Sequence, residues 1–264
     1  MTDILQEIIA HKRIELASSM KAVPEAMLLE RIAKAPPPRD FAAALVSEDG
    51  RPRVIAECKR QSPSRGVMVP NYDPVALATA YENGGAAAIS VLTDERFFGG
   101  NLADLRAVRA RVGLPVLRKD FIVDRYQVYE ARAHGADSFL LLAGVLSSDT
   151  LEELIQQGRS LGMEPLVESH TLDELRVALR TSARVVGINN RDLKTFSVSL
   201  EVARSLVAET QKKAPAPLPV CESGIHARAD IERMQAVGFP AFLIGEALVT
   251  APDPAALLRE LGCR

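Results

Sequence analysis

Short apolar runs alternate with amphipathic segments along most of the chain. The runs lie at residues 54–57, 86–92, 115–117, 139–143, 165–167, 185–188, 218–221 and 241–244. Segments with helical spacing follow each run, at residues 75–82, 102–111, 125–134, 149–161, 172–179, 200–213, 227–237 and 252–261. Nearly continuous apolar strands that alternate with helices indicate an α/β protein with a parallel sheet covered by helices.

Eight such units between residues 54 and 261 fit a (β/α)8 TIM barrel better than a doubly wound sheet. The absence of a GxGxxG motif after the first strand also argues against a dinucleotide-binding sheet. Residues 4–20, 24–34 and 41–46 show helical spacing without any strand signal. We therefore expect one barrel domain, residues 1–264, on which residues 1–48 pack as an N-terminal helical extension.

An acid and a base stand two residues apart at the end of the first predicted strand. Glu57 and Lys59 share one face of the strand, because side chains alternate, and Cys58 lies on the other face. A solvated strand face could carry such a pair without any function. The other strand ends make the functional interpretation stronger.

Six of the eight predicted strands end in ionisable or amide side chains. These ends carry Glu57 and Lys59, Arg118-Lys119-Asp120, Glu168-Ser169-His170, Asn189-Asn190-Arg191-Asp192, Glu222-Ser223-Gly224 and Gly245-Glu246. In a parallel barrel, the carboxyl ends of the strands meet at one mouth, where active sites form. Solvation alone does not explain so many polar ends at one place.

The residue types at this mouth favour acid–base chemistry. Two lysines and three glutamates converge without a His/Cys cluster, so the sequence predicts no metal site. His170 is interpreted as the polar start of the following helix. Ser62 has no histidine partner that could activate it, so we expect its hydroxyl to donate to an anion.

The ends of the last two strands suggest a phosphate as that anion. Barrels often bind phosphate there, through backbone N–H groups at the start of a short helix. Ser223-Gly224 and Gly245 provide small residues with free amides, and Ser62 and Arg191 could complete the site.

Composition and charge narrow the class of protein. The chain is 47% hydrophobic with a formal net charge of −2, which predicts a substantial core and no affinity for nucleic acid or an anionic membrane. Cys58, Cys221 and Cys263 show neither metal spacing nor a disulfide framework, so we expect buried thiols. With no signal peptide or membrane span predicted, a cytoplasmic protein is expected.

Together the strand-end motifs resemble those of the indole-3-glycerol-phosphate synthase family, barrel enzymes of tryptophan biosynthesis. The motifs are Ile55-Ala56-Glu57-Cys58-Lys59-Arg60-Gln61-Ser62-Pro63-Ser64, Leu117-Arg118-Lys119-Asp120-Phe121-Ile122, Leu166-Val167-Glu168, Gly187-Ile188-Asn189-Asn190-Arg191-Asp192-Leu193, Glu222-Ser223-Gly224-Ile225 and Phe242-Leu243-Ile244-Gly245-Glu246-Ala247-Leu248. They keep the family's order over nearly the whole chain.

The resemblance implies a decarboxylating and dehydrating ring closure. Its substrate would be 1-(2-carboxyphenylamino)-1-deoxyribulose 5-phosphate and its product indole-3-glycerol phosphate, with no cofactor and no metal. Lys119 would be the general acid at the ketone, assisted by Glu168, and Lys59 would bind the anthranilate carboxylate. Glu57 is a second candidate acid or base, placed to pair with Lys59.

The remaining site residues would bind and orient the substrate. By the resemblance these are Asn189 and Glu222 for substrate groups, Phe121 within the substrate site, and Ser62, Arg191, Ser223, Gly224, Gly245 and the amide of Glu246 for the phosphate. Glu246 departs from the family, since some members carry serine at this position. We expect its side chain to point away from the phosphate.

Two further expectations concern the lysines and the assembly. A lysine beside another cation has its pKa drawn toward neutrality, so we expect this effect between Lys59 and Lys119. We also expect a monomer that binds only the phosphorylated small molecule, with weak self-association as the alternative.

Other activities are compatible with the same pattern. One is another phosphosugar barrel, either an aldolase that forms a Schiff base on Lys59 or Lys119, or a phosphoribosylanthranilate isomerase. Another is a barrel that binds a phosphorylated ligand without turning it over. Borohydride trapping identifies the aldolase, and turnover excludes the binding protein.

Overall fold

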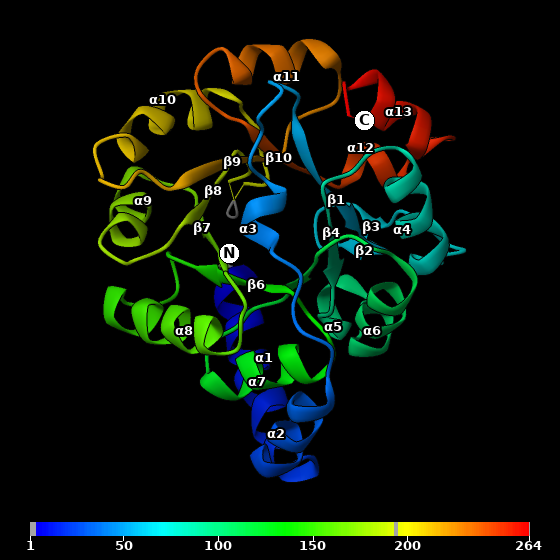
Figure 1. The fold of residues 1–264 in the computed structure, drawn as a ribbon, viewed down its shortest axis with the longest axis vertical. Helices are drawn as coiled ribbons and strands as arrows, with labels where there is room; N and C mark the ends of the chain where they lie inside the picture. Colours follow the sequence, from blue (N-terminus) through cyan, green and yellow to red (C-terminus); the bar gives the residue numbers. More distant parts are fainter. Residues whose placement is uncertain (1–3, 193–194, 264) are drawn as a thin grey trace.

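The structure, a computed structural model, describes residues 4–192 and 195–263. Eight parallel strands form a closed barrel in which β1 pairs with both β4 and β10 (Figure 1). The strands are β1 Arg53–Cys58, β4 Ala88–Leu92, β5 Val116–Lys119, β6 Ser138–Leu142, β7 Leu166–Ser169, β8 Val185–Asn189, β9 Leu218–Glu222 and β10 Ala241–Ile244. The predicted TIM barrel is confirmed, with strand ends within two residues of those expected.

Helices surround the barrel as expected (Figure 1). They are α4 Pro74–Asn83, α6 Leu102–Arg111, α7 Arg125–Ala133, α8 Ser148–Ser160, α9 Leu172–Leu179, α10 Glu201–Thr210, α11 Arg228–Gln235 and α13 Pro254–Glu260, with the short helices α5 Glu95–Phe98 and α12 Glu246–Val249. The sequence did not predict the small hairpin of β2 Gln61–Ser62 and β3 Gly66–Val67. Two-residue strands are too short to show a period in the sequence.

Local side-chain bonds fix where the helices begin. Asp73 caps α4 by accepting hydrogen bonds from the amides of Val75 and Ala76, and Pro74 supplies the first helical residue. At α7, Asp124 and Gln127 form a capping box. Such caps satisfy amides that the helix itself leaves unpaired.

Alternation along the strands produces two apolar layers. Ile55, Leu117 and Leu166 belong to the cluster inside the barrel, and Val54 and Ala56 belong to the larger cluster between strands and helices. Cys58 belongs to the outer cluster, so Glu57 and Lys59 share the inner face as predicted. All three cysteines are free and buried.

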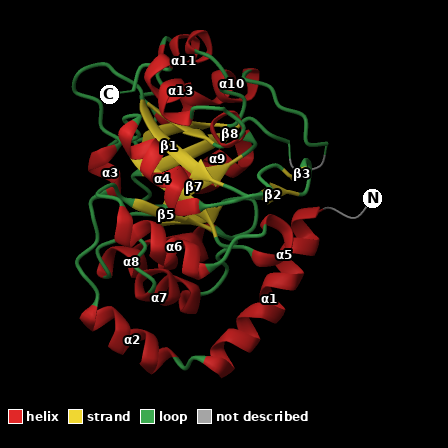
Figure 2. Ribbon diagram, turned by 90° about the vertical axis from the view of Figure 1, so that its right-hand side faces the viewer, coloured by secondary structure: helices red, strands yellow, loops and turns green. Residues whose placement is uncertain are grey.

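The N-terminal extension wraps around the barrel from one end to the other. It consists of α1 Ile4–Ala22, α2 Glu25–Lys34 and α3 Phe41–Ala44. Figure 2 shows α1 on the side of the β2–β3 hairpin and α3 on the opposite side. Phe41 and Leu45 pack into the cluster inside the barrel and close its amino end. The hydroxyl of Tyr126 on α7 donates to the carbonyl of Val23, 2.8 Å away, between α1 and α2.

A buried charge network joins α1 to the catalytic face. Lys12 is 5% exposed. Its Nζ lies 2.9 Å from Asp94 Oδ2 and 3.0 Å from Asp120 Oδ1. Burial lowers the pKa of Lys12, but the pull of Asp120 and Asp94 outweighs it and the net shift is upward. Asp120 also accepts from Arg118 and directly follows Lys119, so the extension is bonded to the strand that carries the proposed acid.

Replacing Lys12 by methionine is expected to destabilise the protein by about 3 kcal/mol, because it leaves buried carboxylates without their cation. Lys21→Met, at an exposed position of the same helix, is the matched control. Urea unfolding measures both. Equal stability of the two variants would show that the network does not fasten α1 to the barrel.

Candidate active site

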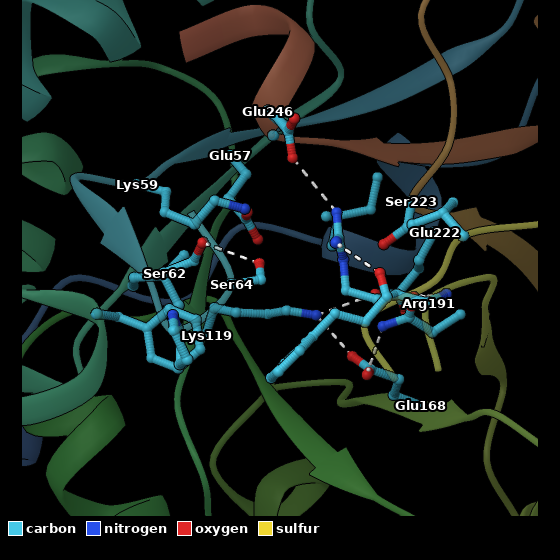
Figure 3. Close-up of a pocket in the computed structure, with 18 of the residues that line it drawn as sticks. Glu57, Lys59, Ser62, Ser64, Lys119, Glu168, Arg191, Glu222, Ser223 and Glu246 are labelled. Atoms are coloured by element: carbon cyan, nitrogen blue, oxygen red, sulfur yellow. Dashed lines mark hydrogen bonds and ion pairs between the residues drawn. The ribbon is translucent and has the colours of Figure 1, made fainter. Parts of the chain in front are cut away.

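The carboxyl ends of the strands open into a pocket of about 590 Å³. Side chains from β1, β5, β7, β8 and β9 point into it (Figure 3), and Ile4, Leu5 and Ile8 of α1 contribute to its wall. Phe121 lines it as well, with its ring 5.9 Å from that of Phe98. The extension therefore forms part of the pocket, whose lining combines apolar surface with charged groups.

Lys119 lies between two carboxylates that come from across the barrel. Its Nζ is 2.6 Å from Glu168 Oε2 and 2.9 Å from Glu222 Oε2 (Figure 3). Burial lowers the pKa of Lys119, but the negative charges of Glu168 and Glu222 raise it more, so the net shift is upward. The expectation of a pKa drawn toward neutrality by Lys59 is wrong, because carboxylates rather than a cation are the nearest charges.

The two carboxylates differ in their surroundings. Burial raises the pKa of Glu168, but Lys119 and then His170 lower it more, so that this carboxyl stays ionised. Burial, and then the charge of Glu168, raise the pKa of Glu222 to about 8. The Oε1 atom of Glu222 is buried with no hydrogen-bond partner, which is consistent with a carboxyl that holds a proton.

A glycine makes room for Glu222. A Cβ atom on Gly187 would lie 1.9 Å from Glu222 Oε1, so a larger residue here would force this carboxyl to move. From the sequence, Gly187 was recognised only as the first residue of a family motif. Its steric role could not be found from sequence, since Gly187 and Glu222 meet only when β8 pairs with β9.

Glu57 and Lys59 form a second ion pair in the same pocket. Lys59 Nζ lies 2.6 Å from Glu57 Oε1, as the shared strand face predicts. Glu57 is 4% exposed. A Cβ atom on Gly245 would lie 2.3 Å from Glu57 Oε1 and 3.1 Å from Lys59 Nζ. The pair is therefore packed directly against the start of α12.

Two lysine–carboxylate clusters thus lie in one barrel mouth. Comparison with known protein families gives a match that extends over nearly the whole chain. The family model described as "Indole-3-glycerol phosphate synthase" matches residues 5–261. The chain belongs to the indole-3-glycerol phosphate synthase family. Enzymes of this family are decarboxylating lyases of tryptophan biosynthesis.

Curated relatives agree with the family. The chain is 49% identical over 269 residues to an indole-3-glycerol phosphate synthase of Roseiflexus sp. (strain RS-1), with 99% of each chain covered. It is 48% identical to the synthase of Roseiflexus castenholzii, with 100% of each chain covered.

Distant solved structures share only the barrel. An N-acetylmannosamine-6-phosphate 2-epimerase from Clostridium perfringens matches with a TM-score of 0.59 and 17% identity, over 74% of this chain and 86% of that one. A thiamine phosphate pyrophosphorylase from Pyrococcus furiosus matches with a TM-score of 0.58 and 16% identity, over 81% of this chain and 94% of that one.

All residues that the synthase resemblance implied lie at the pocket. The structure brings Glu57, Lys59, Lys119, Glu168, Asn189, Glu222, Ser62, Phe121, Arg191, Ser223, Gly224, Gly245 and Glu246 together there. Asn189 donates from Nδ2 to Glu168 Oε1 at 2.9 Å and so orients that carboxylate. Their individual roles remain predictions.

His170 stands directly before α9, as the sequence interpretation has it, and it also contacts the carboxylate of Glu168. Its Nε2 lies 3.1 Å from Glu168 Oε1, and its Nδ1 lies 3.2 Å from Glu174 Oε2. Burial lowers the pKa of His170, but Glu168 and Glu174 raise it by more, so that the pKa is raised to about 10. His170 follows β7 and stands before α9, so its position was right and its contact with Glu168 was missed. Glu174, four residues after His170, was the one sequence feature that indicated a charged partner for this histidine.

The proposed phosphate corner of the synthase site is built from left-handed backbone. Ser223 has φ of 64° and Gly224 has φ of 83°, so the chain turns sharply after β9, and both residues line the pocket. Asn190 Nδ2 holds this segment by donating to the carbonyls of Glu222 and Ser223, at 2.9 and 3.1 Å. The sequence left Asn190 without a role.

The side chain of Glu246 was expected to point away from the phosphate. In the structure it points toward this corner instead. Glu246 begins α12, the short helix predicted near Gly245, and its carboxylate lies 2.5 Å from Arg65. The same carboxylate lies 3.3 Å from Arg191 (Figure 3). The attraction of two guanidinium groups explains the difference. Arg65, which the sequence did not single out, reaches the corner from the turn of the β2–β3 hairpin.

Within residues 4–192 and 195–263, no cluster of three or more His, Cys, Asp and Glu side chains has metal-binding geometry. Over the same ranges, no helix is long and apolar enough to cross a membrane.

Proposed function

We propose that the barrel mouth closes the indole ring as its family does, converting 1-(2-carboxyphenylamino)-1-deoxyribulose 5-phosphate to indole-3-glycerol phosphate, CO₂ and water. The observation that carries the proposal is Lys119, whose Nζ lies 2.6 Å from Glu168 and 2.9 Å from Glu222 inside the pocket. A protonated amine in this position can give its proton to a ketone oxygen while an aromatic carbon attacks the ketone carbon.

The chemistry assigns different tasks to the two clusters. Lys59 binds the anthranilate carboxylate, and the bond from the ring to that carboxyl breaks as CO₂ leaves and the ring regains aromaticity. The new alcohol then leaves as water, which requires a proton at its oxygen and a base for the proton on the neighbouring carbon. Glu222, with its pKa raised to about 8 by burial and by Glu168, can replace the proton that Lys119 gives up.

Conversion of the synthetic ketose phosphate by the purified protein, followed by the fluorescence of the indole product, tests the proposal. Absence of turnover under saturating substrate would contradict it. Borohydride with substrate should leave no covalent adduct, whereas an aldolase would be trapped on Lys59 or Lys119.

Glu57→Gln and Glu168→Gln are expected to slow different steps. Glu57 is paired with Lys59, whereas Glu168 contacts Lys119 from across the barrel. If ring closure and dehydration use different acid–base pairs, single-turnover traces will show a different step slowed in each variant. The same step slowed equally in both variants would contradict this division.

The rate is expected to depend on pH through Glu222. A pKa raised to about 8 means that the carboxyl is protonated below that pH and loses its proton above it. We therefore expect kcat/KM to fall as the pH rises above about 8, and this decline should be absent in Glu222→Gln. Stopped-flow or steady-state pH profiles measure both. An unchanged alkaline decline in the variant would assign it to another group.

We further propose that the protein acts as a monomer in the cytoplasm, on a phosphorylated small molecule. The support is that one chain supplies every residue of the pocket described above. Sedimentation velocity tests the monomer.

A further inference from the structure

The carboxylate of Glu246 forms ion pairs with both arginines of the proposed phosphate corner, Arg65 and Arg191. Its Oε1 lies 2.5 Å from Arg65 Nη2, and its Oε2 lies 3.3 Å from Arg191 Nη2. The two arginines come from separate elements, the β2–β3 hairpin and the segment after β8, and Glu246 comes from the start of α12. Figure 3 shows Glu246 above Arg191 at the edge of the pocket.

The other two cations of the pocket are engaged elsewhere. Lys59 contacts Glu57 at 2.6 Å, and Lys119 contacts Glu168 and Glu222. Among the described residues, Arg65 and Arg191 are the remaining Lys and Arg side chains that line the pocket together with Ser62, Ser223 and Gly224. Both already have an anionic partner, and that partner belongs to the protein itself.

We propose that Glu246 is an internal competitor of the substrate phosphate, holding Arg65 and Arg191 in the free protein and releasing them when the phosphate binds. The inference rests on the proposed phosphate corner and adds to it a residue that sets affinity. Glu246 aligns the two guanidinium groups before substrate arrives, and it weakens binding because its ion pairs must break first.

The exchange is physically favourable for a phosphate ester. A phosphate dianion has three acceptor oxygens and about twice the charge of a carboxylate, so it can bind both guanidinium groups together with the backbone amides. The Glu246 side chain is 22% exposed, and it stands at a helix start near the surface, where it can turn into water. A phosphate monoanion gains less from the same exchange, so the competition favours the dianion.

The test compares Glu246→Gln with the unchanged protein by calorimetric titration with inorganic phosphate, which needs no turnover. The amide keeps the shape and removes the charge, so we expect phosphate to bind roughly threefold to tenfold more tightly. The gain should shrink in the Arg65→Ala background, because one of the two contested cations is then gone. Glu232→Gln, which removes an exposed ion pair with Arg228 on α11, is the matched control and should change nothing.

Unchanged or weaker phosphate binding in Glu246→Gln overturns the inference, as does a gain of the same size in the Arg65→Ala background. The substrate KM is measured separately. A tighter phosphate titration without any turnover would retain the competing role of Glu246 and reject the proposed reaction. Turnover with no change in the phosphate titration would support the proposed reaction and reject the competing role of Glu246.

Discussion

Replacing Lys119 by alanine is expected to lower kcat by a factor on the order of 10² to 10⁴, the range over which a positioned general acid contributes. Its Nζ lies within 2.9 Å of both Glu168 and Glu222, so these two carboxylates hold the ammonium group in place inside the pocket. The fold is expected to survive, because one of the two carboxyls can hold a proton once the lysine is gone.

Steady-state kinetics and thermal unfolding of Lys119→Ala separate the two effects. Lys212→Ala, with a side chain that is 71% exposed beyond α10, is the matched control and should retain full activity. A fall in kcat of less than about tenfold would show that Lys119 is not the general acid. Loss of the folded state would instead assign it a structural role.

Replacing Gly245 by alanine is expected to lower kcat/KM by a factor on the order of 10², because displacing reacting groups by about 1 Å has an effect of this size. The added Cβ would lie 2.3 Å from Glu57 Oε1 and 3.1 Å from Lys59 Nζ, so the pair must move. Valine adds two further methyl groups beside the start of α12, where the phosphate is proposed to bind, so the KM of Gly245→Val should rise still more.

Gly113→Ala is the matched control for this glycine. Neither position has a left-handed backbone, and a Cβ on Gly113 would meet only a Glu82 side-chain oxygen at 3.2 Å. Steady-state kinetics should therefore show a loss at position 245 and none at position 113. Equal activity of Gly245→Ala and the unchanged protein would mean that the Glu57–Lys59 pair tolerates displacement, and that it is not held in a catalytic geometry.

The sequence predicted which charged residues lie at the barrel mouth better than it predicted which of them form ion pairs with one another. Period-two alternation placed Glu57 and Lys59 on one face and Cys58 on the other, which the structure confirms. The order of strands and the rule that barrel sites lie at carboxyl ends brought Lys119, Glu168 and Glu222 to one mouth. Which lysine meets which carboxylate depends on barrel closure, and the sequence-based expectation for the pKa of Lys119 was wrong for that reason.

Contacts between distant parts of the chain were the ones missed. Arg65 and Glu246 are 181 residues apart and meet because the Arg65 side chain reaches from the turn of the β2–β3 hairpin to the start of α12. Lys12 meets Asp120 only because α1 crosses the barrel mouth. His170 is two residues from Glu168, but a sequence does not show whether a side chain after a strand end turns inward or outward.

The sequence by itself determined the barrel, the helical extension and the mouth, because apolar periodicity and strand order are local properties of the chain. Only the tertiary structure decided which charges neutralise one another, where glycine is required, and which carboxyl holds a proton. Charge–charge energies depend on distances of a few ångströms and on burial, and both are set when eight strands close into one barrel.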